Sequence, residues 1–190
     1  MVEKKHQPLP SFAELAPHVR QSVIPKRPFM GDFIQYACDH LMDYRVMFSN
    51  ADILFDSSIG YFTMMSDKVF DSTFYAITRW YKHETEGMTP NPFQWGGSYD
   101  TFVFKPRSIC TNQTALQDLV SNLDFHLGVM GMENRLLWEV RRQYPEMRLI
   151  NPLWQVKTVH NHASPERSAE WAKRVDSGGK SIVISWEYMV

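Results

Sequence analysis

Extended and helical segments alternate along this chain, and the alternation is the feature that most constrains its fold. Extended structure is predicted at 45–48, 53–55, 72–80, 101–104, 148–150, 155–159 and 181–186, and the segment 72–80 is rich in β-branched and aromatic residues. Apolar residues at helical spacing predict helices at 31–43 and 133–142, with another helix at 114–123 and a long loop over 82–98. This order predicts an α/β fold in which helices flank a mixed sheet.

The beginning of the chain differs in composition from the rest. Residues 1–28 contain Pro8, Pro10, Pro17, Pro25 and Pro28. Prolines at these positions exclude a long helix, so we expect an arm that lies on a surface or on a partner. Residues 29–190 are then expected to form a single domain, since a chain of 190 residues is long enough for one core and short for two.

The charge balance and the hydropathy exclude several classes of partner. The formal net charge is −1, and there is no block of Lys and Arg to follow a phosphate backbone, which argues against nucleic acid. No apolar run approaches the roughly 20 residues of a membrane span. Residues 1–10 are polar and do not resemble a signal peptide. These features predict a soluble, cytoplasmic protein.

The two cysteines indicate a reducing compartment. Cys38 and Cys110 are too few for a disulfide framework, and we expect both to be buried, unpaired, small apolar residues. The triplet Asn112-Gln113-Thr114 fits the acceptor pattern for N-glycosylation. Without a secretion signal we expect it to be a chance match.

Two groups of polar residues follow or precede expected strands. Asn50-Ala51-Asp52 comes directly after a strand, where open α/β sheets bind ligands, and Asp52 is a hard oxygen ligand suited to Mg²⁺ or Mn²⁺. An ordinary turn is the alternative for this group. In the run 95–100 the paired glycines Gly96 and Gly97 allow a close backbone approach before Asp100, and an ordinary hairpin loop is the alternative.

Two further groups lie later in the chain. Gly128 and Gly131 precede a helix whose first turn holds Glu133, a position that suits a general base but that acidic residues also favour for the helix dipole alone. His160 and His162 alternate in an extended segment, so both imidazoles can reach one site.

Taken in order, these groups resemble the landmarks of GT-A-type glycosyltransferases, and especially a group of glycosyltransferase-like domains. The resemblance covers roughly residues 29–168. It rests on the runs Asn50–Asp56, Ala76–Trp80, Gly97–Phe104, Gly128–Arg135 and Val156–Ser164, together with Asn151-Pro152 and Arg167. It implies a GT-A-like (Rossmann-like) mixed sheet that is reduced at the N-terminus.

The resemblance also implies an activity, the transfer of a hexosyl group from a nucleotide-sugar donor to a carbohydrate or other hydroxyl acceptor. It implies a divalent cation, Mn²⁺ or Mg²⁺, held by Asp52 with His160 or His162. The catalytic residues would be Glu133, which deprotonates the acceptor, and Asp100. The residues implied in substrate binding are Asn50, Arg79, Gly96, Gly97, Ser98, Asn134, Arg135 and Arg167.

The short N-terminal part leaves an alternative open. Only 49 residues precede Asn50, fewer than the βα units that hold the nucleotide base in that family require. The alternative is a catalytically degenerate domain that serves as a structural subunit or binding module, and an uncovered sheet edge favours an oligomer or a larger complex. A weaker alternative is a carbohydrate-binding module that stacks sugars on Trp80, Tyr81, Phe93 and Trp95, although core packing is the favoured interpretation of these rings.

Overall fold

A four-stranded mixed sheet forms the centre of the protein. The structure is a computed structural model that describes residues 2–3, 23–83, 87–90 and 98–160, together with Val175, Lys180, Ile182 and Ile184. The central sheet contains, in spatial order, β3 (Val46–Ser49), β8 (Tyr99–Phe104), β5 (Thr73–Thr78) and β9 (Arg148–Ile150). β8 is antiparallel to both of its neighbours, and β9 is parallel to β5.

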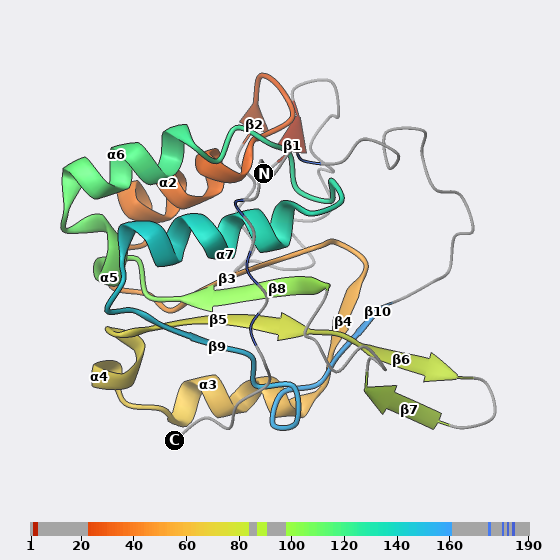
Figure 1. The fold of residues 1–190 in the computed structure, drawn as a ribbon. Helices are drawn as coiled ribbons and strands as arrows, with labels where there is room; N and C mark the ends of the chain where they lie inside the picture. Colours follow the sequence, from red (N-terminus) through yellow and green to blue (C-terminus); the bar gives the residue numbers. More distant parts are fainter. Residues whose placement is uncertain are drawn as a thin grey trace.

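Helical segments cover both faces of this sheet (Figure 1). One face carries the long helices α2 (Met30–His40), α6 (Gln113–Ser121) and α7 (Met132–Gln143). The other face carries the 3₁₀ turn η1 (Ser57–Gly60) and the short helices α3 (Tyr61–Met64) and α4 (Asp67–Phe70). Another short helix, α5 (Arg107–Cys110), follows β8. The described part therefore has three layers, as expected for an α/β fold.

The four central residues of β5, Phe74 to Ile77, are all apolar because both faces of this strand are covered. Phe74 and Ala76 belong to the large core cluster beneath the long helices, whereas Tyr75 and Ile77 pack in a second cluster with residues of the short helices. Successive side chains of a strand point to opposite faces, so a strand covered on both faces needs apolar residues at every position.

A second four-stranded sheet extends from one end of the first. Its order is β4 (Ile53–Phe55), β10 (Thr158–His160), β6 (Trp80–His83) and β7 (Gly87–Pro90). The chain leaves β5 at Thr78 and enters β6 at Trp80, so Arg79 lies at the junction of the two sheets. A separate pair of two-residue strands, β1 (Val2–Glu3) and β2 (Val23–Ile24), is parallel.

Several expectations from the sequence need correction. The extended segment expected at 72–80 is two strands separated at Arg79, and the loop expected over 82–98 contains part of the β6–β7 hairpin. Of the segment expected at 155–159, only its end belongs to β10. The strand expected at 181–186 lies largely outside the described residues, as does most of the arm 1–28, and Ile182 and Ile184 have no regular secondary structure.

The expectation that both cysteines are unpaired is wrong. Cys38 of α2 and Cys110 of α5 form a disulfide with a Cα–Cα distance of 5.6 Å. Their separation of 72 residues in the sequence concealed a contact that depends on helix packing. Disulfides are rare in reducing compartments, so cysteine use no longer supports a reducing environment for this chain.

None of the described helices is both long and apolar enough to cross a membrane.

Candidate functional site

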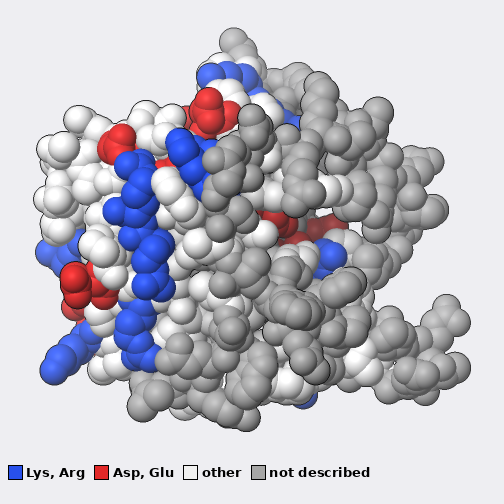
Figure 2. All heavy atoms as spheres, viewed as in Figure 1, with Lys and Arg blue, Asp and Glu red and all other residues white. Residues whose placement is uncertain are grey.

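A pocket of about 680 Å³ opens where the two sheets meet the start of α7. It is lined by Asn50, Ala51, Asp52, Arg79, Ser98, Asp100, Gly128, Met130, Gly131, Glu133, Asn134 and His160. Figure 2 shows acidic and basic side chains together at the bottom of a recess on this face of the molecule. The recess brings together residues from the turn after β3, the β5–β6 junction, the start of β8, the start of α7 and the end of β10.

Asp100 is at the centre of the polar network in this pocket. Its side chain is 3% exposed. Asn50 Nδ2 donates a hydrogen bond to its Oδ1 over 2.9 Å, and Arg79 Nη1 lies 3.3 Å from Oδ1 and 3.2 Å from Oδ2. The Asn50 backbone N–H also donates to the Asp100 carbonyl oxygen over 3.0 Å. The network therefore fixes the turn after β3 against the start of β8.

Burial gives Asp100 unusual acid–base behaviour. Desolvation raises the pKa of the Asp100 carboxyl to about 6, although the Arg79 guanidinium and the Asn50 amide both lower it. The nearby Asp52 carboxylate raises the pKa further. For Arg79, burial lowers the pKa of the guanidinium, but the Asp100 carboxylate, the Tyr81 hydroxyl and the Glu133 carboxyl together outweigh that effect, and the pKa is raised overall. At neutral pH the two side chains thus form a buried ion pair at the wall of the pocket.

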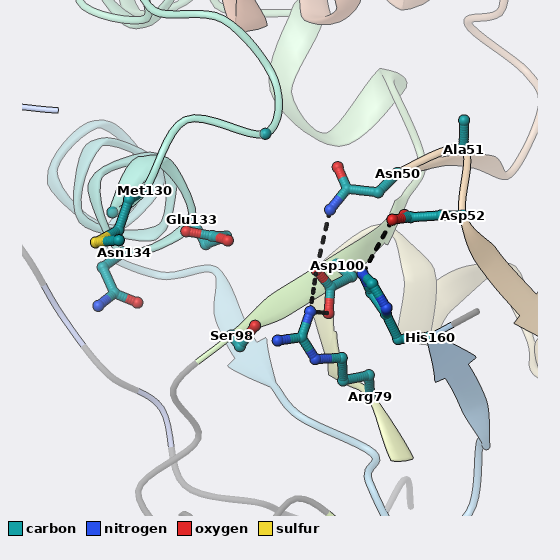
Figure 3. A pocket seen from close by; sticks show the side chains of 12 residues that line it. Asn50, Ala51, Asp52, Arg79, Ser98, Asp100, Met130, Glu133, Asn134 and His160 are labelled. Atoms are coloured by element: carbon teal, nitrogen blue, oxygen red, sulfur yellow. Dashed lines mark hydrogen bonds and ion pairs between the residues drawn. The ribbon is translucent and has the colours of Figure 1, made fainter. Parts of the chain in front are cut away.

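Glu133 faces this pair from the first turn of α7 (Figure 3). Burial raises the pKa of the Glu133 carboxyl to about 7, and the Asp100 carboxylate contributes in the same direction. Arg79 opposes the shift. A carboxyl group with a pKa near the working pH can both accept and release a proton, which is the requirement for a general base or acid.

The backbone around Glu133 is shaped for close approach. Gly131, the residue that precedes α7, has φ 84°, and Gly128 has φ 81°. Residues that carry a Cβ atom rarely adopt this left-handed backbone conformation, so glycine fits at both positions. Ser98, on the opposite wall, has φ 94° and is the non-glycine residue with a positive φ in the described part of the chain. Strained residues of this kind gather at functional sites.

Asp52 and His160 form a second polar pair in the pocket. His160 Nε2 lies 3.0 Å from Asp52 Oδ2, and the Asp52 side chain is 50% exposed. The pair results from the antiparallel β4–β10 ladder, in which His160 is the partner of Ile53, the residue after Asp52. An exposed carboxylate beside an imidazole is a donor set that suits a divalent cation.

The pair by itself is an incomplete metal site. Within the described residues there is no group of three or more His, Cys, Asp or Glu side chains that could hold a metal ion. Mg²⁺ in phosphate-transfer sites is commonly bound by one or two carboxylates plus substrate phosphates and water. The residues present therefore fit a cation that arrives with a phosphate ligand, and they do not form a closed structural metal site.

The pocket gathers many of the residues that the sequence indicated. Those that line it are Asn50, Asp52, Arg79, Ser98, Asp100, Glu133, Asn134 and His160. Arg135 does not line it, because its guanidinium turns to the fully buried carboxylate of Glu139, with nitrogen–oxygen distances of 2.7 and 2.8 Å. Gly96, Gly97, His162 and Arg167 lie outside the described residues.

Two lining residues had no role in the sequence interpretation. Ala51 and Met130 both line the pocket, and each is adjacent in sequence to a residue of an indicated motif. The available signal was therefore position within a motif, since neither side chain carries polar chemistry.

The indicated aromatic residues differ in their surroundings. Trp80 is buried, its Nε1–H donates to the Leu153 carbonyl oxygen over 2.9 Å, and its ring meets that of Trp154 edge-on. The Tyr81 ring lies beneath the Arg79 guanidinium, 5.4 Å from the ring centroid. Phe93 and Trp95 lie outside the described residues. Core packing is thus the role of Trp80.

Comparison with protein-family models, with curated proteins and with solved structures found no match to this chain.

Proposed function

We propose that this protein transfers a sugar from a nucleotide-sugar donor to a hydroxyl acceptor in the pocket around Asp100. The observation that carries the proposal is the convergence of Asp52, Glu133 and His160 on one pocket, although they are far apart in sequence. A relic of a lost activity has no requirement to keep three such groups together at a solvent-reached recess. The convergence supports an enzyme over a purely structural subunit.

Asp52 and His160 are the residues that would hold a divalent cation, Mn²⁺ or Mg²⁺. When bound, such a cation neutralises negative charge on the departing diphosphate. Three carboxyl groups and one arginine line the pocket, so a diphosphate meets a negative surface unless a cation accompanies it. This charge balance supports a donor that binds as a metal complex.

Glu133 is the residue we assign to the acceptor. Its carboxylate accepts the proton of the acceptor hydroxyl while the acceptor oxygen forms a bond to the anomeric carbon of the donor. The bond from that carbon to the diphosphate oxygen breaks, and the nucleoside diphosphate leaves. A pKa of about 7 leaves a substantial fraction of Glu133 ionised and able to take the proton at neutral pH.

Asp100 and Arg79 are assigned to orientation. The Asp100 carboxylate holds the Arg79 guanidinium at 3.2 Å and the Asn50 amide at 2.9 Å, so the positions of both donors are fixed before substrate binds. A guanidinium has several N–H donors in a planar fork, and the ones that Asp100 and the Tyr81 hydroxyl do not use suit phosphate oxygens. Preorganised donors of this kind cost no rearrangement during the reaction.

The test is binding of nucleoside diphosphates and nucleotide-sugars with and without Mn²⁺, measured by calorimetry and thermal unfolding. We expect a nucleotide to raise the melting temperature only when Mn²⁺ is present, and Asp52→Ala to abolish that rise. Asp124→Ala is the matched control, because Asp124 is exposed and does not line the pocket.

A failed test would point to the alternative function. If the wild-type protein is folded and no nucleotide binds it with or without Mn²⁺, the transferase proposal is wrong. The protein would then be a glycosyltransferase-like domain that serves as a structural subunit or binding module.

A further inference from the structure

The triplet Asn112-Gln113-Thr114 consists of the N-cap and the first two residues of α6, just after α5, at the surface of the protein. Asn112, Gln113 and Thr114 are all exposed, and Gln113 is compatible with the acceptor pattern for N-glycosylation, which excludes only proline at that position. A match to so short a pattern occurs by chance in many proteins. Its meaning depends on whether the protein passes through a compartment where the modification takes place.

The disulfide supplies that second observation. Cys110 lies two residues before Asn112 and is bonded to Cys38. Disulfides form and persist in oxidising environments such as the lumen of the endoplasmic reticulum, where N-glycosylation also occurs. The Cys38–Cys110 disulfide favours an oxidising environment for this protein, and in such an environment the triplet can be modified.

We propose that Asn112 is an N-glycosylation site. The acceptor nitrogen, Nδ2, forms a bond to the anomeric carbon of a lipid-diphosphate-linked oligosaccharide. The bond from that carbon to the diphosphate oxygen breaks, the lipid diphosphate leaves, and Nδ2 loses one proton. The oligosaccharide donor is the chemical class of substrate for this site, and it is distinct from the substrate of the pocket.

The local geometry allows the glycan and the fold to coexist. Asn112 is the N-cap of α6, and it uses its side-chain oxygen Oδ1 to accept the Ala115 N–H over 3.1 Å. Glycosylation consumes a hydrogen of Nδ2 and leaves the carbonyl oxygen unchanged. The cap, which contributes about 1 kcal/mol in a typical helix, is therefore kept in the modified protein.

The glycan would also leave the pocket open. The pocket includes Ser98 and Asp100 at the start of β8, whereas Asn112 follows the other end of the same strand, beyond α5. Figure 1 shows α5 and the adjoining end of α6 at the opposite side of the molecule from β4 and β10, which carry the Asp52–His160 end of the pocket.

The test uses the full chain with a small tag, produced in the cells that normally make it. Peptides from the purified protein are analysed by mass spectrometry before and after treatment with a peptide N-glycosidase, which converts a glycosylated asparagine to aspartate. Non-reducing peptide mapping of the same sample measures the Cys38–Cys110 bond. We expect glycan on the Asn112 peptide and a bonded cysteine pair.

Three variants make the result specific. Thr114→Ala removes the hydroxyl that the acceptor pattern requires, and Thr114→Ser keeps one, so glycan should disappear in the first and remain in the second. Asn112→Asp removes the acceptor nitrogen but keeps a good N-cap, so glycan should disappear while the variant keeps the melting temperature of the enzyme-treated wild type, in which Asn112 has become aspartate. An unmodified Asn112 peptide in the wild-type protein would overturn the proposal, whether the cysteines are bonded or free.

Discussion

The side-chain hydroxyl of Tyr99 forms two hydrogen bonds with the backbone of Ile184. It donates to the Ile184 carbonyl oxygen and accepts from the Ile184 N–H, each over 2.9 Å. Both residues are buried, and burial raises the pKa of the Tyr99 hydroxyl to about 12, so it remains protonated and able to donate. Tyr99 lies between Ser98 and Asp100, two residues that line the pocket, and it connects this wall to a residue near the C-terminus.

Replacing Tyr99 by Phe should destabilise the protein by about 1–3 kcal/mol, because it leaves a buried N–H and a buried carbonyl without a partner. The free energy of unfolding from urea titration measures the effect. Tyr61→Phe is the control, since the Tyr61 side chain is 44% exposed and the same atom is removed. Equal stabilities of the two variants would show that the Tyr99–Ile184 bonds contribute nothing.

Glu133 should make stability depend on pH. Its pKa is raised from 4.5 to about 7 in the folded protein, so the native state holds a proton that the unfolded state has lost between these values. The free energy of unfolding contributed by Glu133 therefore falls as the pH rises through this window. Glu133→Gln has no ionisable group at this position, so this fall in the free energy of unfolding with rising pH should be absent from the variant.

The measurement is the difference in melting temperature between Glu133→Gln and wild type at pH 5 and at pH 8. We expect the difference to shift in favour of the variant at pH 8, by an amount equivalent to about 1–3 kcal/mol. Glu146→Gln, at an exposed position, should show no such shift. A difference for Glu133→Gln that stays constant from pH 5 to pH 8 would contradict the raised pKa.

Gly31 of α2 packs closely against Val120 of α6, and this contact predicts the effect of adding a methyl group at position 31. A Cβ atom at Gly31 would lie 2.6 Å from the backbone oxygen of Val120, and a backbone atom cannot move aside as the end of a side chain can. Gly31→Ala should therefore cost about 1–3 kcal/mol through overpacking. Gly60→Ala is the matched control, because no atom lies within 4 Å of a Cβ at that position, and we expect it to be neutral or slightly stabilising. Urea titration measures the free energy of unfolding of both variants. A Gly31→Ala protein that is as stable as wild type would refute the close approach of the helices.

The sequence was informative wherever local pattern determines structure. The apolar spacing of residues 133–142 predicted α7, which is observed as Met132–Gln143, and the short extended segment predicted at 148–150 is β9 with the same bounds. Asn50 and Asp52 were indicated because polar groups directly after a strand lie at the edge of a sheet. Such signals are carried by neighbouring residues and need no knowledge of tertiary packing.

Tertiary contacts set the limit of that approach. Arg135 and Asn134 are adjacent in the same motif, but successive residues of a helix point in different directions, so Asn134 lines the pocket and Arg135 binds Glu139. Glu139 is fully buried and is paired with both Arg135 and Arg142. Only the packed structure reveals that this carboxylate is buried and therefore needs charged partners. Similarly, the break at Arg79 that separates β5 from β6 follows from the meeting of two sheets, since the residues on either side are good β-formers.

The disulfide provides the last prediction. Cys38 and Cys110 are 72 residues apart in sequence, and their bond fixes α2 against the short helix that follows β8. A cross-link that closes a long loop stabilises mainly by restricting the unfolded chain, so its removal should lower the free energy of unfolding by about 2–4 kcal/mol. We expect the Cys38→Ala/Cys110→Ala variant and the wild-type protein in a strong reductant to unfold at similar, lower urea concentrations. Reductant should leave the variant itself unaffected, which separates loss of the bond from other effects of the reagent. A wild-type urea midpoint that does not change with reductant, when mass analysis shows both thiols to be free, would mean that the bond does not stabilise the fold.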